Sequence, residues 1–294
     1  MLLGASLRGH SDARFRHVTR RRLAWTERAR RSPRENTVGL RPRALAAGVQ
    51  PATFERVLPT LSYNPRVVAL DRDQPGPSRT GSAIASFRPY RDRHVDAARI
   101  NRGRARYASL RRLLGAIERQ TGVPESITVA IWGHETNYGS YTGDFDLLRS
   151  LATLAYDGRR RELFTGEFIA ALQLMDRGIS RDTLKGSWAG ATGQGQFLPS
   201  MVLRLGRDGD GDGRVDMWNS QADALASIGN YLIDAGWKPD VAWGVPVRTP
   251  AALDRASLKS RMTSPRCPRV HERHAEYVPT AIGGKDLLQI ATRA

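Results

Sequence analysis

The sequence is poor in cysteine: Cys267 is the only one among 294 residues. A single cysteine excludes an internal disulfide and a metal cluster built from several thiolates, and it leaves the redox compartment open. The sequence also lacks any run approaching the ~18 apolar residues that a membrane-spanning helix needs. Its first residues include arginines but no continuous apolar segment of the kind found in signal peptides. We therefore expect no transmembrane segment, and no signal peptide is visible.

Acidic residues are also scarce, with 29 Asp and Glu against 46 Lys and Arg, which gives a net charge of +17. The excess lies at the two ends, because residues 1–43 hold 12 arginines and 3 acids whereas residues 44–247 hold 25 basic and 22 acidic residues. Neither end shows a helix-turn-helix, zinc-finger or aromatic RNA-binding pattern. We expect no specific nucleic-acid partner; the alternative is DNA binding through the arginine-rich ends.

The chain divides into three segments by composition. Residues 1–43 lack sustained periodicity and are predicted to be a disordered, arginine-rich N-terminal extension. Residues 44–247 are predicted to be one compact domain, since a segment of this length can bury a sizeable core. Residues 248–294 are rich in proline and basic residues and are predicted to be an irregular basic C-terminal tail.

Apolar residues in the middle segment recur at helical spacing, and each stripe stops at a glycine. This pattern is more typical of a packed helical core than of cofactor contacts, so it predicts a mainly α domain and no organic cofactor. The first stripe predicts one long helix through Leu110. The stripes are Leu110, Leu113, Leu114 and Ile117 before Gly122; Leu147, Leu148, Leu151 and Leu154 before Gly158; and Phe168, Leu172 and Met175 before Gly178.

An acid interrupts the apolar face of another predicted helix, which begins at Pro124. Ile127, Ile131 and Glu135 recur every four residues and so share one face of this helix. A carboxyl group that leans on apolar neighbours holds its proton more tightly and can donate it near neutrality. Glu135 is therefore a candidate catalytic acid; the alternative is a glutamate near a helix end that simply faces water.

A glycine-rich stretch follows at residues 186–200. It has four glycines in its first ten residues, interleaved with Ser, Gln and aromatic side chains. Such a loop allows its backbone to approach a ligand closely, although a plain flexible connection has the same composition. No lysine follows the glycines and no parallel-strand pattern precedes them, so they do not form a phosphate-binding fingerprint.

Four aspartates crowd the stretch 208–219. The spacing of Asp208, Asp210 and Asp212, with glycine at the sixth position and Val215 at the eighth, matches a calcium loop. The pattern departs at the twelfth position, where Asn219 replaces the usual glutamate, so we expect lower affinity unless another acid such as Asp223 completes the set of ligands. We predict a structural Ca²⁺ ion here, the alternative being a solvated acidic turn.

Three motifs in a fixed order resemble the lytic murein transglycosylase B family. They are Ile-Trp-Gly-His-Glu-Thr at 131–136, Leu-Ala-Thr-Leu-Ala-Tyr-Asp-Gly-Arg-Arg at 151–160, and the glycine-rich stretch 186–200 followed by the aspartate loop. The resemblance implies a lysozyme-like α+β lytic domain with an EF-hand-like calcium loop. It also implies cleavage of the MurNAc–GlcNAc β-1,4 bond of peptidoglycan without water, which leaves 1,6-anhydro-MurNAc ends.

The resemblance also implies roles for individual residues, with Glu135 as the only catalytic carboxyl group, acid first and base afterwards. Substrate contacts carried over from the family are Ser187, Gln196, Phe197, Arg159 and Arg160. Cation ligands carried over are Asp208, Asp210, Asp212, the Arg214 carbonyl and Asp223. The expected partner is a peptidoglycan glycan strand, the expected location is the periplasm or cell envelope, and the expected state is a monomer.

This chain departs from the family pattern at two points. Nothing after Val247 matches the Asn-Tyr-Asn-type segment and the tyrosine that complete the family's cleft, and the family's signal peptide or lipobox is missing. The leading alternative is therefore a glycan-binding domain without catalytic activity.

Overall fold

The computed structural model describes residues 39–74, 88–239, 241, 247–248 and 276–277. Within these residues, no helix combines the length and the apolar character needed to cross a membrane. The chain forms two compact units, residues 1–87 with 131–228, and residues 88–130 with 229–294. The boundaries between the units fall inside two helices, α9 (Glu125–Thr136) and α13 (Gln221–Asp234).

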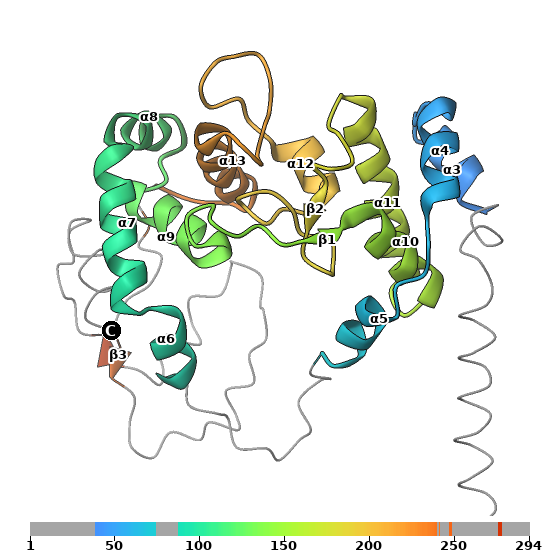
Figure 1. Ribbon diagram of the computed structural model, residues 1–294. Helices are drawn as coiled ribbons and strands as arrows, with labels where there is room; N and C mark the ends of the chain where they lie inside the picture. The colour runs from blue at the N-terminus through green and yellow to red at the C-terminus, as the bar shows by residue number, and fades with distance from the viewer. Residues whose placement is uncertain (1–38, 75–87, 240, 242–246, 249–275, 278–294) are drawn as a thin grey trace, which may run out of the picture. The chain divides into compact units, whose positions relative to one another are not determined.

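Helices α10 (Leu147–Asp157) and α11 (Arg161–Asp176) lie side by side in the first unit (Figure 1). Shorter helices pack on this pair: α3, α4 and α12 contact α11, and α5 contacts α10. These are α3 (Leu40–Ala46), α4 (Pro51–Val57), which continues into the 3₁₀ turn η2 (Leu58–Thr60), α5 (Pro65–Arg72) and α12 (Pro199–Leu205).

The core of the first unit centres on α10, whose predicted stripe is buried in full. The helix begins where the Asp146 side chain accepts a hydrogen bond from the Arg149 backbone N–H at 2.9 Å. It ends at Gly158, which adopts a left-handed conformation with φ +89°. The spacing of the leucines and the glycine stop therefore predicted this helix correctly.

Among the described residues of the first unit, strand structure consists of one short pair and two isolated bridges at Thr192. Strand β1 (Phe145–Asp146) runs antiparallel to β2 (Lys185–Gly186), with Phe145 opposite Gly186. A Cβ atom on Gly186 would lie 2.0 Å from the Ala191 carbonyl oxygen, so this close approach requires glycine. The pair ties the segment after α9 to the glycine-rich loop, and the predicted mainly α class is confirmed.

The helices of the second unit are α6 (Arg88–His94), α7 (Ala97–Ser109) and α8 (Arg111–Thr121). The prediction of one long helix through Leu110 is wrong, because Leu110 takes φ −109° and ψ 11° and separates α7 from α8. Gly122 ends α8 with φ +66°, as predicted, and its carbonyl accepts a hydrogen bond from Trp237 Nε1 at 2.8 Å.

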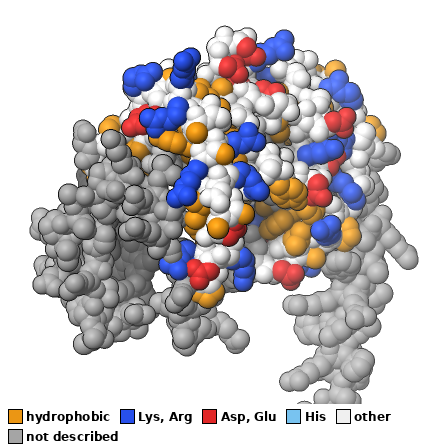
Figure 2. Space-filling view, turned by 60° about the vertical axis from the view of Figure 1, so that its left-hand side comes forward, with side chains coloured by type: hydrophobic (Ala, Val, Ile, Leu, Met, Phe, Trp, Pro, Cys, Tyr) orange, Lys and Arg blue, Asp and Glu red, His pale blue; other side chains and the backbone are white. Residues whose placement is uncertain are grey.

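Charge is unevenly distributed within the nearly neutral middle segment. Residues 88–130 contain ten arginines and four acids, whereas residues 131–228 contain ten basic and thirteen acidic residues. Figure 2 shows basic side chains spread over the displayed face with acidic side chains among them. The near-neutrality of residues 44–247 is therefore the average of a basic helical segment and a mildly acidic one.

The described residues reach into both predicted flanks. Helix α3 begins at Leu40, inside the extension predicted for residues 1–43, whose residues 1–38 lie outside the described part. In the predicted irregular tail, Arg248 of β3 (Val247–Arg248) pairs with Glu276 of the antiparallel strand β4 (Glu276–Tyr277). Cys267 lies outside the described residues.

Candidate active site

Glu135 lies on the last turn of α9, and its side chain is exposed. The prediction that apolar neighbours cover this acid is wrong, since Ile127 and Ile131 are only half-buried. The buried face is displaced by one residue and carries Thr128, Trp132 and Thr136. Because two of these three buried residues are threonines, the pattern of hydrophobic residues did not predict this face. No described residue forms an ion pair or a hydrogen bond with the Glu135 carboxylate, which is therefore open to a ligand.

The buried face of α9 anchors the end of the helix. Trp132 is fully buried and its Nε1 donates to Gln194 Oε1 at 3.0 Å, while Thr136 Oγ1 donates to the Gln194 carbonyl at 2.8 Å. The ring of Tyr138 packs edge-on against Trp132 at a centroid distance of 5.6 Å. A Cβ atom on Gly133 would lie 2.5 Å from the Tyr138 ring, so only glycine permits this packing.

Three residues other than glycine have positive φ among the described residues, and two of them directly follow helix α9. Asn137 and Tyr138 (φ +53° and +62°) come two and three residues after Glu135, and Gln196 (φ +51°) lies in the glycine-rich loop. Left-handed backbone is unfavourable for side chains as bulky as tyrosine, and such strain is concentrated at functional sites. The geometry thus singles out the same two segments as the sequence motifs.

The glycine-rich loop is held by its own hydrogen bonds and is not a loose connection. Ser187 Oγ accepts from the Ala191 backbone N–H at 3.0 Å, and the Ser187 N–H donates to the Ala191 carbonyl at 2.7 Å. Gln196 Nε2 donates to the Thr142 and Gly193 carbonyls, both at 3.0 Å. Since Thr142 follows Glu135 by seven residues, this amide joins the loop to the segment after α9.

Phe197 lies in the core of the loop, where 6% of its surface is exposed. Its backbone exchanges two hydrogen bonds with Thr192, at 2.9 and 3.0 Å. Ser187, Gln196 and Phe197 therefore lie in one loop held by internal hydrogen bonds, and Phe197 is the least accessible of these three residues.

Arg159 and Arg160 are paired with a residue that the sequence did not single out. Asp71, which is 1% exposed, lies 2.9 Å from Arg159 Nε and 2.6 Å from Arg160 Nη2. The Arg160 guanidinium also lies over the Phe164 ring at 4.9 Å. The two arginines thus join the turn between α10 and α11 to α5, and their side chains remain 44% and 37% exposed, although the Nε atom of Arg160 is buried.

The aspartate loop brings three carboxylates together: oxygens of Asp208, Asp210 and Asp212 lie within 4.8 Å of one another, and all three residues are exposed. The Gly213 backbone N–H, at 2.8 Å, holds the pKa of the Asp208 carboxyl below its ordinary value. This hard-oxygen donor set fits a calcium ion.

Asp223 stands outside that cluster of three. It is 1% exposed, and its two oxygens accept from the Gly209 N–H at 2.8 Å and the Asp216 N–H at 2.6 Å. Asp223 thus closes the aspartate loop, because it binds the backbone at Gly209 and at Asp216. The Arg214 backbone N–H donates to Asp212 Oδ1 at 2.8 Å, which keeps this turn tight.

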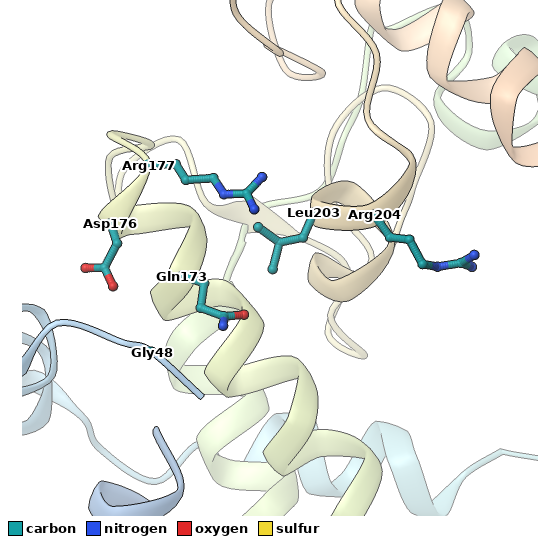
Figure 3. Close-up of a pocket in the computed structure, with 6 residues that line it drawn as sticks. All are labelled: Gly48, Gln173, Asp176, Arg177, Leu203 and Arg204. Atoms are coloured by element: carbon teal, nitrogen blue, oxygen red, sulfur yellow. The ribbon is translucent and has the colours of Figure 1, made fainter. Parts of the chain in front are cut away.

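A pocket of about 450 Å³ contains none of the predicted site residues (Figure 3). Its polar side chains already hold the connection between α3 and α4 against α11, because Gln173 Nε2 donates to the Ala47 carbonyl at 2.6 Å and Asp176 Oδ2 accepts from the Gln50 N–H at 2.9 Å. Figure 3 shows Arg204 pointing away from these two side chains. The pocket is lined by Gly48, Gln173, Asp176, Arg177, Leu203 and Arg204.

Comparison with known proteins decides the family. Residues 32–286 match the model of the transglycosylase SLT domain family. The chain belongs to this family. A further match is the membrane-bound lytic murein transglycosylase B of Escherichia coli (strain K12), 44% identical over 119 residues, which are 40% of this chain and 32% of that protein. The resemblance inferred from the three motifs is thereby confirmed.

Solved structures agree with this SLT-domain assignment. SltB3 from Pseudomonas aeruginosa in complex with NAG-NAM-pentapeptide is 40% identical with a TM-score of 0.68, and the match covers 76% of this chain and 59% of SltB3. The E. coli lytic transglycosylase Slt35 in complex with calcium is 28% identical with a TM-score of 0.65, covering 75% and 68%. The protein therefore has the mainly helical, lysozyme-like SLT fold. The chain spans under two thirds of the length of SltB3 and about a third of the length of the E. coli transglycosylase B.

Proposed function

We propose that this SLT-domain protein is a peptidoglycan lytic transglycosylase that cleaves the MurNAc–GlcNAc β-1,4 bond without water and leaves 1,6-anhydro-MurNAc ends. The observation that carries the proposal is the open Glu135 carboxylate at the end of a helix anchored by Trp132 and Thr136. Support comes from SltB3, a relative solved with NAG-NAM-pentapeptide and with NAG-anhNAM-pentapeptide. The proposed catalytic part is residues 44–247.

One carboxyl group suffices for this reaction. A glycoside hydrolase of the usual type needs two, one for the leaving oxygen and one as base or nucleophile. In the proposed reaction Glu135 donates a proton to the glycosidic oxygen as its bond to C1 breaks, and then accepts the proton of the C6 hydroxyl as the oxygen of that hydroxyl bonds to C1. The nucleophile is held by the substrate itself, so its approach costs little entropy.

Of the two acids that next follow Glu135 in the chain, Asp146 makes contacts that disfavour a role as a second catalytic carboxylate. Asp146 Oδ1 caps α10, and Asp146 Oδ2 accepts from Arg181 Nε and Nη2 at 2.9 and 2.8 Å. A carboxylate engaged in this way is a poor base or nucleophile. Asp144 is exposed and is the remaining candidate for a second acid.

Substrate contacts are proposed for the same loop and turn. Ser187 Oγ accepts a backbone N–H, so its own hydrogen is available to a sugar or acetamido oxygen. No described residue donates to Gln196 Oε1, which can therefore accept from a substrate N–H or hydroxyl. Phe197 is proposed to line the cleft. Arg159 and Arg160 offer their accessible edges to a lactyl or peptide carboxylate.

Digestion of purified sacculi tests the function. We expect mass spectrometry to detect muropeptides with anhydro ends. Products with reducing ends alone would indicate a lysozyme-type hydrolase instead. Binding to sacculi without any product would favour the alternative of a non-catalytic glycan-binding domain.

We also propose that the aspartate loop binds a structural Ca²⁺ ion through Asp208, Asp210, Asp212 and the Arg214 carbonyl. The three clustered carboxylates support this, as does the calcium complex of the relative Slt35. Asp223 is proposed to act chiefly by closing the loop, and it becomes a direct ligand only if one oxygen is shared with the ion. Since its substrate lies in the cell wall, the protein is proposed to act in the cell envelope as a monomer.

Calcium is expected to raise the melting temperature of the protein by binding only the folded loop, and a chelator should reverse the shift. Asp210→Ala should abolish the response. The matched control is Asp182→Ala, an exposed acid outside the cluster, which should keep it. Thermal unfolding with and without millimolar calcium measures the effect. An unchanged melting temperature of the wild type would contradict the proposed calcium site.

A further inference from the structure

We propose that Gln194 is a positioning residue for Glu135: its buried amide clamps the end of α9 to the segment that leaves the aspartate loop. The inference rests on the proposed function, in which Glu135 is the acid and base. Gln194 is 5% exposed and therefore acts on a substrate only through other residues.

On one side Gln194 holds the helix that carries Glu135. Its Oε1 accepts from Trp132 Nε1 at 3.0 Å, and its backbone carbonyl accepts from Thr136 Oγ1 at 2.8 Å. Trp132 stands one helical turn before Glu135, and Thr136 follows it directly. The last turn of the helix is thus held at two points that bracket the acid.

On the other side Gln194 holds residues 217–218. Its backbone N–H donates to the Met217 carbonyl at 2.8 Å, and its Nε2 donates to the Trp218 carbonyl at 3.1 Å. Met217 is fully buried, so this anchor is itself fixed. All four polar groups of Gln194 are therefore used, and an apolar replacement leaves the Trp132 indole N–H and the Trp218 carbonyl without this partner.

The turn after Glu135 is shaped around the same side chain. Gly139 has φ +76°, and a Cβ atom there would lie 2.3 Å from Gln194 Oε1. The Gly139 N–H donates to Thr136 Oγ1 at 3.0 Å. The same Thr136 hydroxyl donates to the Gln194 carbonyl, so it links the turn to Gln194. Gln194 thus contacts both the last turn of the helix and the turn that follows it, and so helps to fix the backbone that carries Glu135.

A displaced acid loses rate more than affinity, because misplacement of ~1 Å can cost ~100-fold in rate. In Gln194→Met, which keeps the volume and removes the side-chain hydrogen bonds, we expect kcat for anhydro-muropeptide release to fall at least ~10-fold. KM and sacculus binding should stay within about twofold, because Gln194 does not touch the substrate.

Gln173→Met is the matched control. The Gln173 amide also donates to a backbone carbonyl, that of Ala47 at 2.6 Å. Gln173 lines the pocket on α11 and is not among the residues that hold the end of α9. This variant should keep kcat, and it should lose less stability than Gln194→Met, because Gln173 is more exposed and gives up one hydrogen bond. A Gln194→Met enzyme whose kcat stays within twofold of that of the control would overturn the proposal.

Amide hydrogen exchange on the same proteins separates this inference from the proposed function. Peptides covering residues 132–139 should exchange at least ~10-fold faster in Gln194→Met and be unchanged in Gln173→Met. If the wild type releases no product, the proposed function fails, and unchanged exchange in this segment refutes the positioning role independently. If Gln194→Met does not fold, Trp132→Phe removes the donor to Oε1 and must give the same two effects, or the proposal is wrong.

Discussion

Glu135→Gln is expected to lower the rate of anhydro-muropeptide release by at least ~100-fold, or ~2.7 kcal/mol of activation free energy. The amide keeps the shape of the side chain but can neither donate nor recover the proton that the proposed mechanism moves twice. Folding should be unaffected, because the side chain is exposed and substitutions at such positions usually change stability by less than ~0.5 kcal/mol. Melting temperature, sacculus binding and product release are measured on one preparation.

Asp144→Asn is the control for Glu135→Gln, since it neutralises an exposed acid in the following loop. It should keep most of the wild-type rate. If Glu135→Gln retains more than about a tenth of that rate, Glu135 is not the catalyst. The search then moves to Asp144 and Asp146.

The largest effect on stability is expected from Leu151→Ala, at ~2–5 kcal/mol of unfolding free energy. Leu151 is fully buried on α10, and its side chain fills the space beside Gly190, where an added Cβ atom would lie 2.6 Å from Leu151 Cδ2. The substitution leaves a cavity beneath the glycine-rich loop. Urea denaturation at fixed calcium concentration measures the loss.

Leu163→Ala is the control for this cavity, because Leu163 lies on the neighbouring helix α11 with 44% of its surface exposed. Its cost should stay within ~0.5 kcal/mol. Equal destabilisation by the two substitutions would contradict the central place of α10 in the core.

Local signals in the sequence predicted much of the fold. The leucine stripe of α10, its stop at Gly158 and the capping of α8 at Gly122 were all evident, because spacing and left-handed glycines act within a few residues. The family motifs also located Glu135, the glycine-rich loop and the aspartate cluster. These features depend on residues that are neighbours in sequence, so the sequence by itself determined them.

Other features were decided only by the tertiary structure. The buried face of α9 includes Thr128 and Thr136, and Thr136 is buried against Gln194, a residue 58 positions away. Local hydrophobicity cannot predict which polar residue will find such a partner. The expectation that Ile127 and Ile131 would shield Glu135 failed for this reason.

The same holds for the pairing of Arg160 with Asp71 across 89 residues, and for Gln194, which no motif marked as important. Each of these side chains is polar, and its free energy in the fold depends on whether a distant segment supplies a hydrogen-bond partner. The sequence therefore determined the helices and placed the acid on one of them. Only packing against a segment 58 to 62 residues away decided which face of that helix is buried and which residue holds its end.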